Sequence, residues 1–294
     1  MAATRKVKHS KNPFKGKPTP GPSQCHPSIG TRTPSHGCLP LDVLRSVGAK
    51  LGVKAQGGKA LRKGIENVLN ITTPGAERTF LYKLPLADQE KADLARRCLR
   101  PAIPQSWLSD PDMWLDSNNI ANVLNQYEEA YPDFEFMGPF PIDFAAPDPY
   151  KGGGPGGERK CLMNEICELR VQQALANGTK HVGIVYNLDP HFKSGSHWVA
   201  NFIDIKNHAC YYFDSYGMAP PMQVAKFMKW LTTQDPKMKL QYNSRRLQYN
   251  NTECGIYCIY FIIMMLTGEP FLKITRRKPN DAMMLDLRDW FFST

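Results

Sequence analysis

Two features are missing from this 294-residue sequence: a long apolar run, and acidic residues near the N-terminus. The longest apolar run covers residues 256–266, which is too short to cross a membrane, so we expect no membrane contact. The opening stretch MAATRKVKHSKNPFKGK has none of the apolar character of a signal peptide. The eight cysteines lack the paired spacing of zinc sites. We therefore predict no metal site, free thiols and a reducing compartment.

The charge of the chain is concentrated at its start. Residues 1–41 contain seven Lys and Arg residues and no Asp or Glu, which leaves 30 basic and 27 acidic residues for the rest of the chain. The same stretch is rich in Pro, Ser, Thr and Gly, a composition typical of disorder. We predict that residues 1–37 form a basic disordered tail. Two roles stay open for it: a solubilising terminus, or a contact with nucleic-acid phosphates that ignores base sequence.

Three amphipathic stretches follow the tail and predict a small helical module over residues 38–100. They are GCLPLDVLRSVGAKLGV at 37–53, KALRKGIENVLNI at 59–71 and LADQEKADLARRCL at 86–99. Two prolines in LRPAIPQSWL then break the helical pattern. The composition changes after Pro101, so we place the start of a second, larger domain at residue 101 and extend it to residue 294.

The larger domain mixes helical and extended patterns without an internal repeat. Helices are predicted over residues 114–132, 161–178, 222–232 and 255–266, and residues 151–157 (KGGGPGG) predict a flexible loop. Extended segments are predicted at 134–144, 181–188, 196–205, 209–216, 239–243 and 245–250. This pattern indicates an α+β fold with a small central mixed sheet, helices packed on it, and a helical N-terminal extension.

Two cysteines near residue 256 have different surroundings. Cys258 lies inside the apolar run and is best explained as a small core residue. Cys254 follows the polar stretch QYNNTE and stands where the buried helix begins. A helix N-terminus stabilises a thiolate, and the glycine at 255 leaves room for a substrate backbone. Cys254 is therefore a candidate nucleophile.

A nucleophilic cysteine needs a base, and the base needs an orienting acid. His197 begins an extended run, and Asp214 ends the next one. If the hairpin turn lies at residues 206–208, Asp214 falls opposite residue 200 or 201, a few residues from His197. Gln248 lies six residues before Cys254, and its neutral amide is suited to donate to an oxyanion. Taken alone, each of these residues also has an ordinary structural explanation.

The joint order of these pieces is more specific. HW at 197–198, YFDSYG at 212–217 and QYNNTECGIY at 248–257 put Asp214 17 residues after His197 and Gln248 six before Cys254. In this they closely resemble the Ulp1/adenain-type cysteine proteases, which include SUMO-specific proteases and maturation proteases of adenoviruses and large DNA viruses. The resemblance covers roughly residues 107–270. It implies a papain-like core with His197, Asp214, Gln248 and Cys254 as catalytic residues.

The resemblance extends to two tryptophans. WLDSNNI at 114–120 is similar to a family segment that opens a helix, although Ser117 stands where many members have Asp. In the family, its Trp and the Trp after the catalytic His enclose a channel that admits only a glycine pair. The resemblance therefore implies that Trp114 and Trp198 bind substrate.

The N-terminal segment HGCLPLDVLRSVGAKLGV, residues 36–53, resembles proteases of large cytoplasmic DNA viruses. This implies cleavage of capsid or core polyproteins after Gly-Gly motifs during virion maturation, by acyl transfer to Cys254 and without a cofactor. The expected location is the virion and the host cytoplasm. Two alternatives stay open: a deconjugating protease for SUMO-like or ubiquitin-like modifiers, and a basic nucleic-acid-binding virion protein with a vestigial protease fold.

Overall fold

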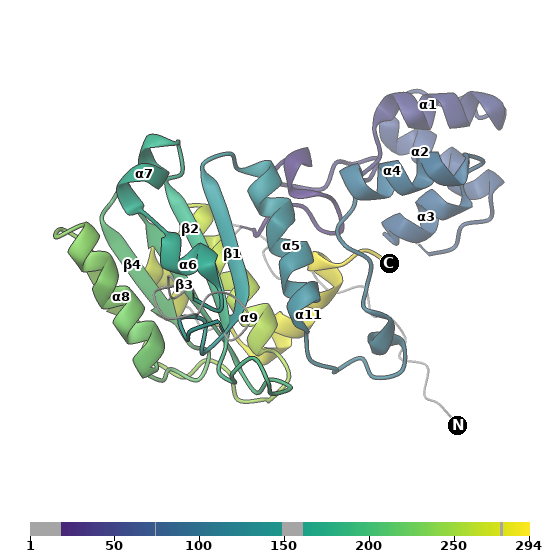
Figure 1. The fold of residues 1–294 in the computed structure, drawn as a ribbon. Coiled ribbons are helices and arrows are strands. Elements are labelled where there is room, and N and C mark those ends of the chain that lie inside the picture. The colour runs from purple at the N-terminus through teal and green to yellow at the C-terminus, as the bar shows by residue number, and fades with distance from the viewer. Residues whose placement is uncertain (1–18, 74, 149–160, 277–278) are drawn as a thin grey trace.

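The computed structural model describes residues 19–73, 75–148, 161–276 and 279–294, and it has the α+β architecture that the sequence predicts (Figure 1). The expected tail residues 1–18 and the expected loop at 151–157 lie outside the described residues. In the described part of the chain, no helix is long and apolar enough to span a bilayer.

A five-stranded mixed sheet forms the centre of the molecule, with the strand order β1-β2-β3-β4-β5. Its strands are β1 (Phe134–Pro141), β2 (His181–Asn187), β3 (Trp198–Asp204), β4 (Ala209–Phe213) and β5 (Lys239–Tyr242). The two outer pairs, β1 with β2 and β4 with β5, are parallel, and the central pairs are antiparallel. The sixth expected strand, at 245–250, is not one: these residues form a loop beyond the edge strand β5.

Helices cover both faces of the sheet, and the alternation of β3 explains why. Trp198, Ala200 and Phe202 point into one hydrophobic cluster, whereas Val199 and Ile203 point into another. The first cluster contains residues of α5 (Ser117–Ala130), α9 (Cys254–Leu266), α10 (Phe271–Arg276) and α11 (Asp281–Phe291). The second contains residues of α6 (Asn164–Glu168), α7 (Val171–Ala176) and α8 (Met222–Gln234). The sequence predicted a single helix over 161–178, where the structure has α6 and α7.

The central helix α9 is apolar all round, and every residue from Cys254 to Met264 is buried, as its composition predicts. It packs on β3, with α5 and α11 beside it. A helix enclosed in this way is fixed by its neighbours, so its first residue has a defined position in the molecule.

Four helices at one end of the molecule pack around a core of their own (Figure 1). They are α1 (Leu41–Lys50), α2 (Gly58–Val68), α3 (Glu77–Lys83) and α4 (Asp88–Cys98). Their sequence predicts three of them and misses α3. The buried Arg62 guanidinium holds this cluster together: Nη1 lies 2.9 Å from Glu77 Oε2, and the group stacks 3.5 Å from the Phe80 ring centroid. A short 3₁₀ helix at Gln105–Leu108 follows.

The prediction of a disordered tail is wrong for residues 19–37. Cys25 and His26 are buried, a 3₁₀ turn forms at Pro27–Ile29, and the Gln24 amide donates to the Trp290 carbonyl oxygen at 3.0 Å. This segment is therefore packed between the helical cluster and the C-terminal end of the chain, where low-complexity composition alone favoured disorder.

The prediction that all cysteines are free thiols is also wrong. Cys25 is bonded to Cys38, and Cys161 to Cys167. Cys98, Cys210, Cys254 and Cys258 are free, and all four are buried. Four of the eight cysteines are therefore free thiols.

Candidate active site

Cys254 is the first residue of α9, where the sequence placed it. Glu253 is the N-cap residue, but its side chain accepts no hydrogen bond from the helix. The first helical hydrogen bond runs from the Tyr257 amide to the Glu253 carbonyl oxygen at 2.9 Å. The positive end of the helix therefore faces the Cys254 side chain without a carboxylate cap.

His197 and Asp214 meet at the edge of the sheet. His197 directly precedes β3, Asp214 directly follows β4, and His197 Nε2 lies 2.8 Å from Asp214 Oδ1. The Cys254 side chain is close enough to the imidazole to influence its pKa. Burial favours the neutral imidazole, but hydrogen bonds to Asp214 and Cys254 and their negative charges outweigh it and raise the pKa of His197 to about 9. The geometry brings together an acid, a base and a thiol.

A tight turn after β4 fixes Asp214. The Gly217 amide donates to the Asp214 carbonyl oxygen at 2.8 Å, and the Tyr216 amide donates to Asp214 Oδ1 at 2.8 Å. Gly217 has a φ of +74°, and a Cβ there would lie 2.5 Å from the backbone of Arg245. Only glycine fits both conditions, so the turn is pressed against the loop that follows β5.

Asn243, at the end of β5, joins the same two loops. Its Oδ1 accepts from the Asp214 amide at 2.9 Å, and its Nδ2 donates to the Asp214 carbonyl oxygen at 2.7 Å. This residue was missed by sequence reasoning, since an asparagine after a short strand usually indicates only a turn.

Gln248 lies in that loop and is fully buried. Its backbone amide donates to the Ser215 carbonyl oxygen at 2.9 Å, and its Oε1 accepts from Ser215 Oγ at 2.6 Å. Within the described part of the chain, its Nε2 has no hydrogen-bond partner. Buried amide donors are almost always satisfied, so an open donor with a fixed orientation is unusual and is suited to bind a ligand oxygen.

An aromatic stack covers the imidazole. The Tyr216 ring is parallel to the His197 ring, with centroids 4.4 Å apart, and the Arg246 guanidinium lies 5.1 Å from the Tyr216 centroid. Arg246 Nε in turn donates to the Gln248 carbonyl oxygen at 2.8 Å. Tyr216 and Arg246, which the sequence did not single out, thus connect the histidine with the glutamine.

Gly255 has a different role from the one expected. A Cβ there would lie 3.0 Å from Leu115 Cβ and 3.4 Å from Ile120 Cδ1, so the missing side chain makes room for Ile120 of α5 and for Leu115, two residues before this helix. The Leu115 carbonyl oxygen accepts from Trp198 Nε1 at 3.0 Å, which ties the tryptophan after His197 to the same contact.

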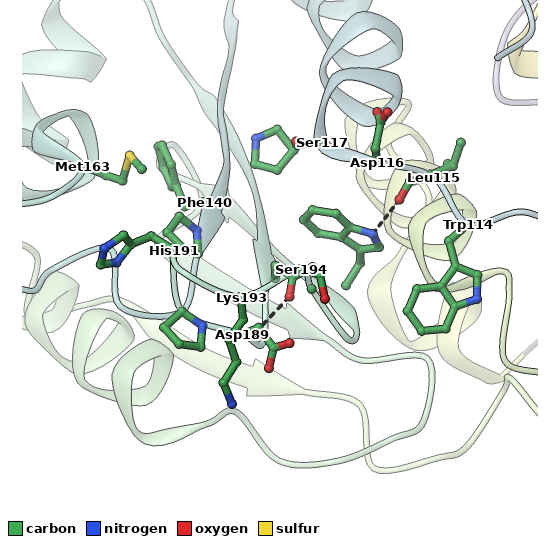
Figure 2. A pocket seen from close by; sticks show the side chains of 16 residues that line it. Trp114, Leu115, Asp116, Ser117, Phe140, Met163, Asp189, His191, Lys193 and Ser194 are labelled. Atoms are coloured by element: carbon green, nitrogen blue, oxygen red, sulfur yellow. Dashed lines mark hydrogen bonds between the residues drawn. The ribbon is translucent and has the colours of Figure 1, made fainter. Parts of the chain in front are cut away.

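A pocket of about 410 Å³ lies beside this contact, and Trp114 and Trp198 both line it. Figure 2 shows Trp114 at one end of the pocket, beyond Leu115 and Asp116. Asp116 caps α5 by accepting from the Asn119 backbone amide at 2.7 Å. The cap fixes the helix start and with it the residues that carry Trp114 to the pocket. None of the four predicted catalytic residues lines this pocket.

The second thiol near the site, that of Cys258, belongs to the core. Burial, together with the charges of Cys254 and Asp214, raises the pKa of Cys258, which keeps this cysteine neutral, in line with its interpretation as a core residue. In the regions covered by the structure, no group of three or more His, Cys, Asp and Glu side chains is arranged to hold a metal ion.

Comparison with known proteins relates the chain to a family of proteases. Residues 175–289 match the Ulp1 protease family, C-terminal catalytic domain. These residues form a Ulp1-family catalytic domain. A protein of Acanthamoeba polyphaga mimivirus that is named as a thiol protease is 33% identical over 61% of this chain and 56% of its own length. The African swine fever virus protein named SUMO-1 cysteine protease is 31% identical over 37% of this chain and 43% of its own. The matches thus span about half the length of the curated relatives.

The crystal structure of an African swine fever virus protease shares the fold of this chain. It superposes with a TM-score of 0.61 at 20% identity, over 94% of this chain and 97% of the other. The likeness therefore includes the helical cluster as well as the sheet.

Proposed function

We propose that this chain is a cysteine endopeptidase with Cys254 as nucleophile, His197 as base, Asp214 as orienting acid and Gln248 as oxyanion donor. The observation that carries the proposal is the open Nε2 of Gln248, buried beside a Cys–His–Asp arrangement at an uncapped helix start. Ser215 holds the Gln248 side chain through Oε1, while no described residue accepts a hydrogen bond from Nε2. The contacts of the described residues therefore do not explain why this amide is buried here.

The mechanism follows from the two sides of the imidazole. Asp214 accepts from Nε2, which leaves Nδ1 to take the thiol proton from Cys254. The thiolate attacks the scissile carbonyl carbon, and Gln248 Nε2 with the Cys254 amide binds the oxygen that becomes negative. The imidazolium protonates the leaving amine, and water then hydrolyses the thioester with His197 as base. No step needs a cofactor.

We propose a Gly-Gly pair before the scissile bond as the substrate motif. Trp198 follows His197 directly and is buried, with its indole fixed to Leu115. In the binding mode that we propose, a peptide lies along the pocket beside Trp114 and passes Trp198 on its way to Cys254, where a side chain would be excluded by sterics. The mimivirus and African swine fever virus relatives come from large DNA viruses, and this viral origin supports a viral substrate. We therefore propose a capsid or core polyprotein cleaved during virion maturation, in the virion and the host cytoplasm.

We also propose that residues 101–294 are the protease domain and residues 38–100 a separate module. The separate hydrophobic core of α1 to α4 supports this division. The proposal of a nucleic-acid contact through phosphates now concerns residues 1–18, which hold six of the seven basic residues before Leu41. A gel-shift titration with and without these residues tests it, and binding that survives truncation contradicts it.

The test of the protease uses fluorogenic peptides that end in Gly-Gly before the scissile bond, together with SUMO and ubiquitin C-terminal adducts. We expect the wild type to cleave the peptides and Cys254→Ala to be inactive. Cys258→Ala, a thiol removed from the same helix, is the matched control and should stay active if folded. Turnover by Cys254→Ala would refute the nucleophile.

The same assay separates the two protease functions. Cleavage of Gly-Gly peptides without processing of the folded adducts supports the maturation protease. Rapid processing of a folded modifier with little peptide cleavage would replace it by a deconjugating protease, the activity suggested by the name of the African swine fever virus relative.

A further inference from the structure

A buried ion pair adjoins the proposed nucleophile. Glu253 is fully buried and Arg288 of α11 is 4% exposed. Arg288 Nε lies 2.9 Å from Glu253 Oε2, and Nη2 lies 2.9 Å from Oε1, so the contact is bidentate. Removing one partner of a pair like this leaves an uncompensated charge in the interior.

Arg288 also holds the loops on both sides of the site. Its Nη1 donates to the carbonyl oxygens of Pro111 and Met113 at 3.0 and 2.8 Å, and its Nη2 to that of Thr252 at 3.3 Å. Met113 precedes Trp114, and Thr252 precedes Glu253 by one residue. One guanidinium thus connects the loop of the pocket tryptophan with the loop that leads into α9.

The position of Glu253 next to Cys254 gives the ion pair an electrostatic effect on the thiol in addition to its structural role. Glu253 is bonded directly to the proposed nucleophile, and a negative charge there opposes the formation of a thiolate. Its carboxylate is directed to Arg288 and not onto the amides of the first helical turn. The carboxylate therefore does not compete for those amides with negative charge on sulfur or on substrate oxygen.

We infer that Arg288 is a positioning residue of the active site, which neutralises the Glu253 carboxylate and keeps it away from the helix start so that Cys254 can ionise. The inference rests on Cys254 being the nucleophile proposed above. It concerns the charge state of the thiol before any substrate binds.

The remaining groups around the thiol are few, which makes the contribution of this pair measurable. His197 faces Cys254 from the start of β3, and Asp214 and Tyr216 from the turn after β4. Cys258 lies one turn further along α9, and α5 contributes the apolar Ile120 near the helix start. Besides Arg288, Glu253 is near the Thr252 and Tyr257 hydroxyls, and Asp281 lies beyond the latter.

The experiment measures the rate of Cys254 alkylation by iodoacetamide against pH, with the modified residue identified by peptide mass. The rate follows the thiolate fraction. We expect Arg288→Gln to move the midpoint of the profile upward by about one pH unit, because Glu253 is left unneutralised. Glu253→Gln should move it downward, and the double variant should return it close to the wild-type value.

Two further variants separate charge from packing. Arg288→Lys keeps the charge and should keep the midpoint. Arg62→Gln breaks the buried Arg62–Glu77 pair in the helical cluster, at a comparable burial, and should lower stability without moving the midpoint. If Arg288→Gln does not fold, Glu253→Gln and the double variant decide.

An unchanged midpoint in Glu253→Gln, or equal shifts in Arg288→Gln and Arg62→Gln, overturns the inference. Because alkylation needs no substrate, failure of the proposed function gives a different result. In that case the midpoints shift as expected but no peptide is cleaved.

Discussion

At the scale of single residues, Gln248 has the most decisive side chain, because one end of its amide is fixed and the other is open. We predict that Gln248→Ala lowers kcat by roughly 10²–10³-fold, or about 2.7–4 kcal/mol in the barrier, with little change in KM. Peptide kinetics measures both constants. Gln241→Ala on the edge strand β5 is the control, and wild-type kcat in Gln248→Ala would remove the oxyanion role.

The pKa of His197 leads to a prediction about pH. Since this pKa is raised to about 9, the imidazolium that protonates the leaving amine persists through neutral pH, and kcat/KM should fall as pH rises through about 9. Asp214→Asn removes a hydrogen bond and a charge that raise this pKa. The basic limb of the pH profile should therefore move to lower pH, and a limb that stays near 9 in this variant would show that His197 does not cause it.

The sequence singled out His197 and Asp214 as candidates, but it did not resolve the register that brings their side chains into contact. With a turn at 206–208, Asp214 was expected opposite residue 200 or 201, but Ala200 pairs with Phe213, so Asp214 lies one step closer to His197. Moving the hairpin turn by one residue shifts the register of the two strands, and the pattern of apolar residues does not fix the turn to within one residue. The supporting contacts of Ser215, Asn243 and Arg288 have no local sequence signal, because each connects segments that are distant in the chain.

At the scale of elements, the start of α9 leads to a prediction that separates stability from activity. Gly255→Ala should gain about 1 kcal/mol of helix propensity. It should lose a similar amount because its Cβ meets Leu115 at 3.0 Å. A displaced Leu115 moves the carbonyl that holds Trp198. We therefore expect a nearly unchanged unfolding free energy and a raised KM for Gly-Gly peptides.

Denaturant unfolding and peptide kinetics on the same sample test this expectation. Gly64→Ala in α2, where a Cβ would meet the Val53 side chain at 2.4 Å, is a control for crowding away from the site. A large loss of stability in Gly255→Ala with unchanged KM would show that the contact serves packing alone.

The elements that the sequence missed were short or lay beyond the motifs. α3 has seven residues, too few for a periodic pattern to stand out. α11 did have a signal: Asn280 caps it by accepting from the Met283 amide, and Met284, Leu287 and Phe291 recur at helical spacing. The strand expected at 245–250 has an extended pattern, but its residues serve the loop that carries Gln248.

At the scale of the whole molecule, composition misled the prediction for residues 19–37. The mean composition of a basic, proline-rich stretch does not reveal single residues that can be buried. Cys25 and His26 are two such residues, and both are buried. The Thr294 carbonyl oxygen accepts from the Arg78 and Thr79 amides, so segments from both ends of the sequence meet at the helical cluster. Contacts between such distant segments are not visible in local patterns.

The disulfide between Cys25 and Cys38 should make a measurable contribution to the unfolding free energy. It joins the segment 19–37 to the start of the helical cluster across 13 residues, and closing a loop of this length contributes about 3 kcal/mol to stability. We predict that a variant with both cysteines changed to Ala loses about this much unfolding free energy without reductant, whereas Gly-Gly peptide cleavage is retained. The Cys161–Cys167 loop of six residues is the control and should contribute about 2 kcal/mol. Reductant breaks both disulfides of the wild type, so it should lower the unfolding free energy below that of the first variant, by about the contribution of the Cys161–Cys167 bond. Equal stability of wild type and variant under oxidising conditions would mean that the packing of residues 19–37 does not depend on the bond.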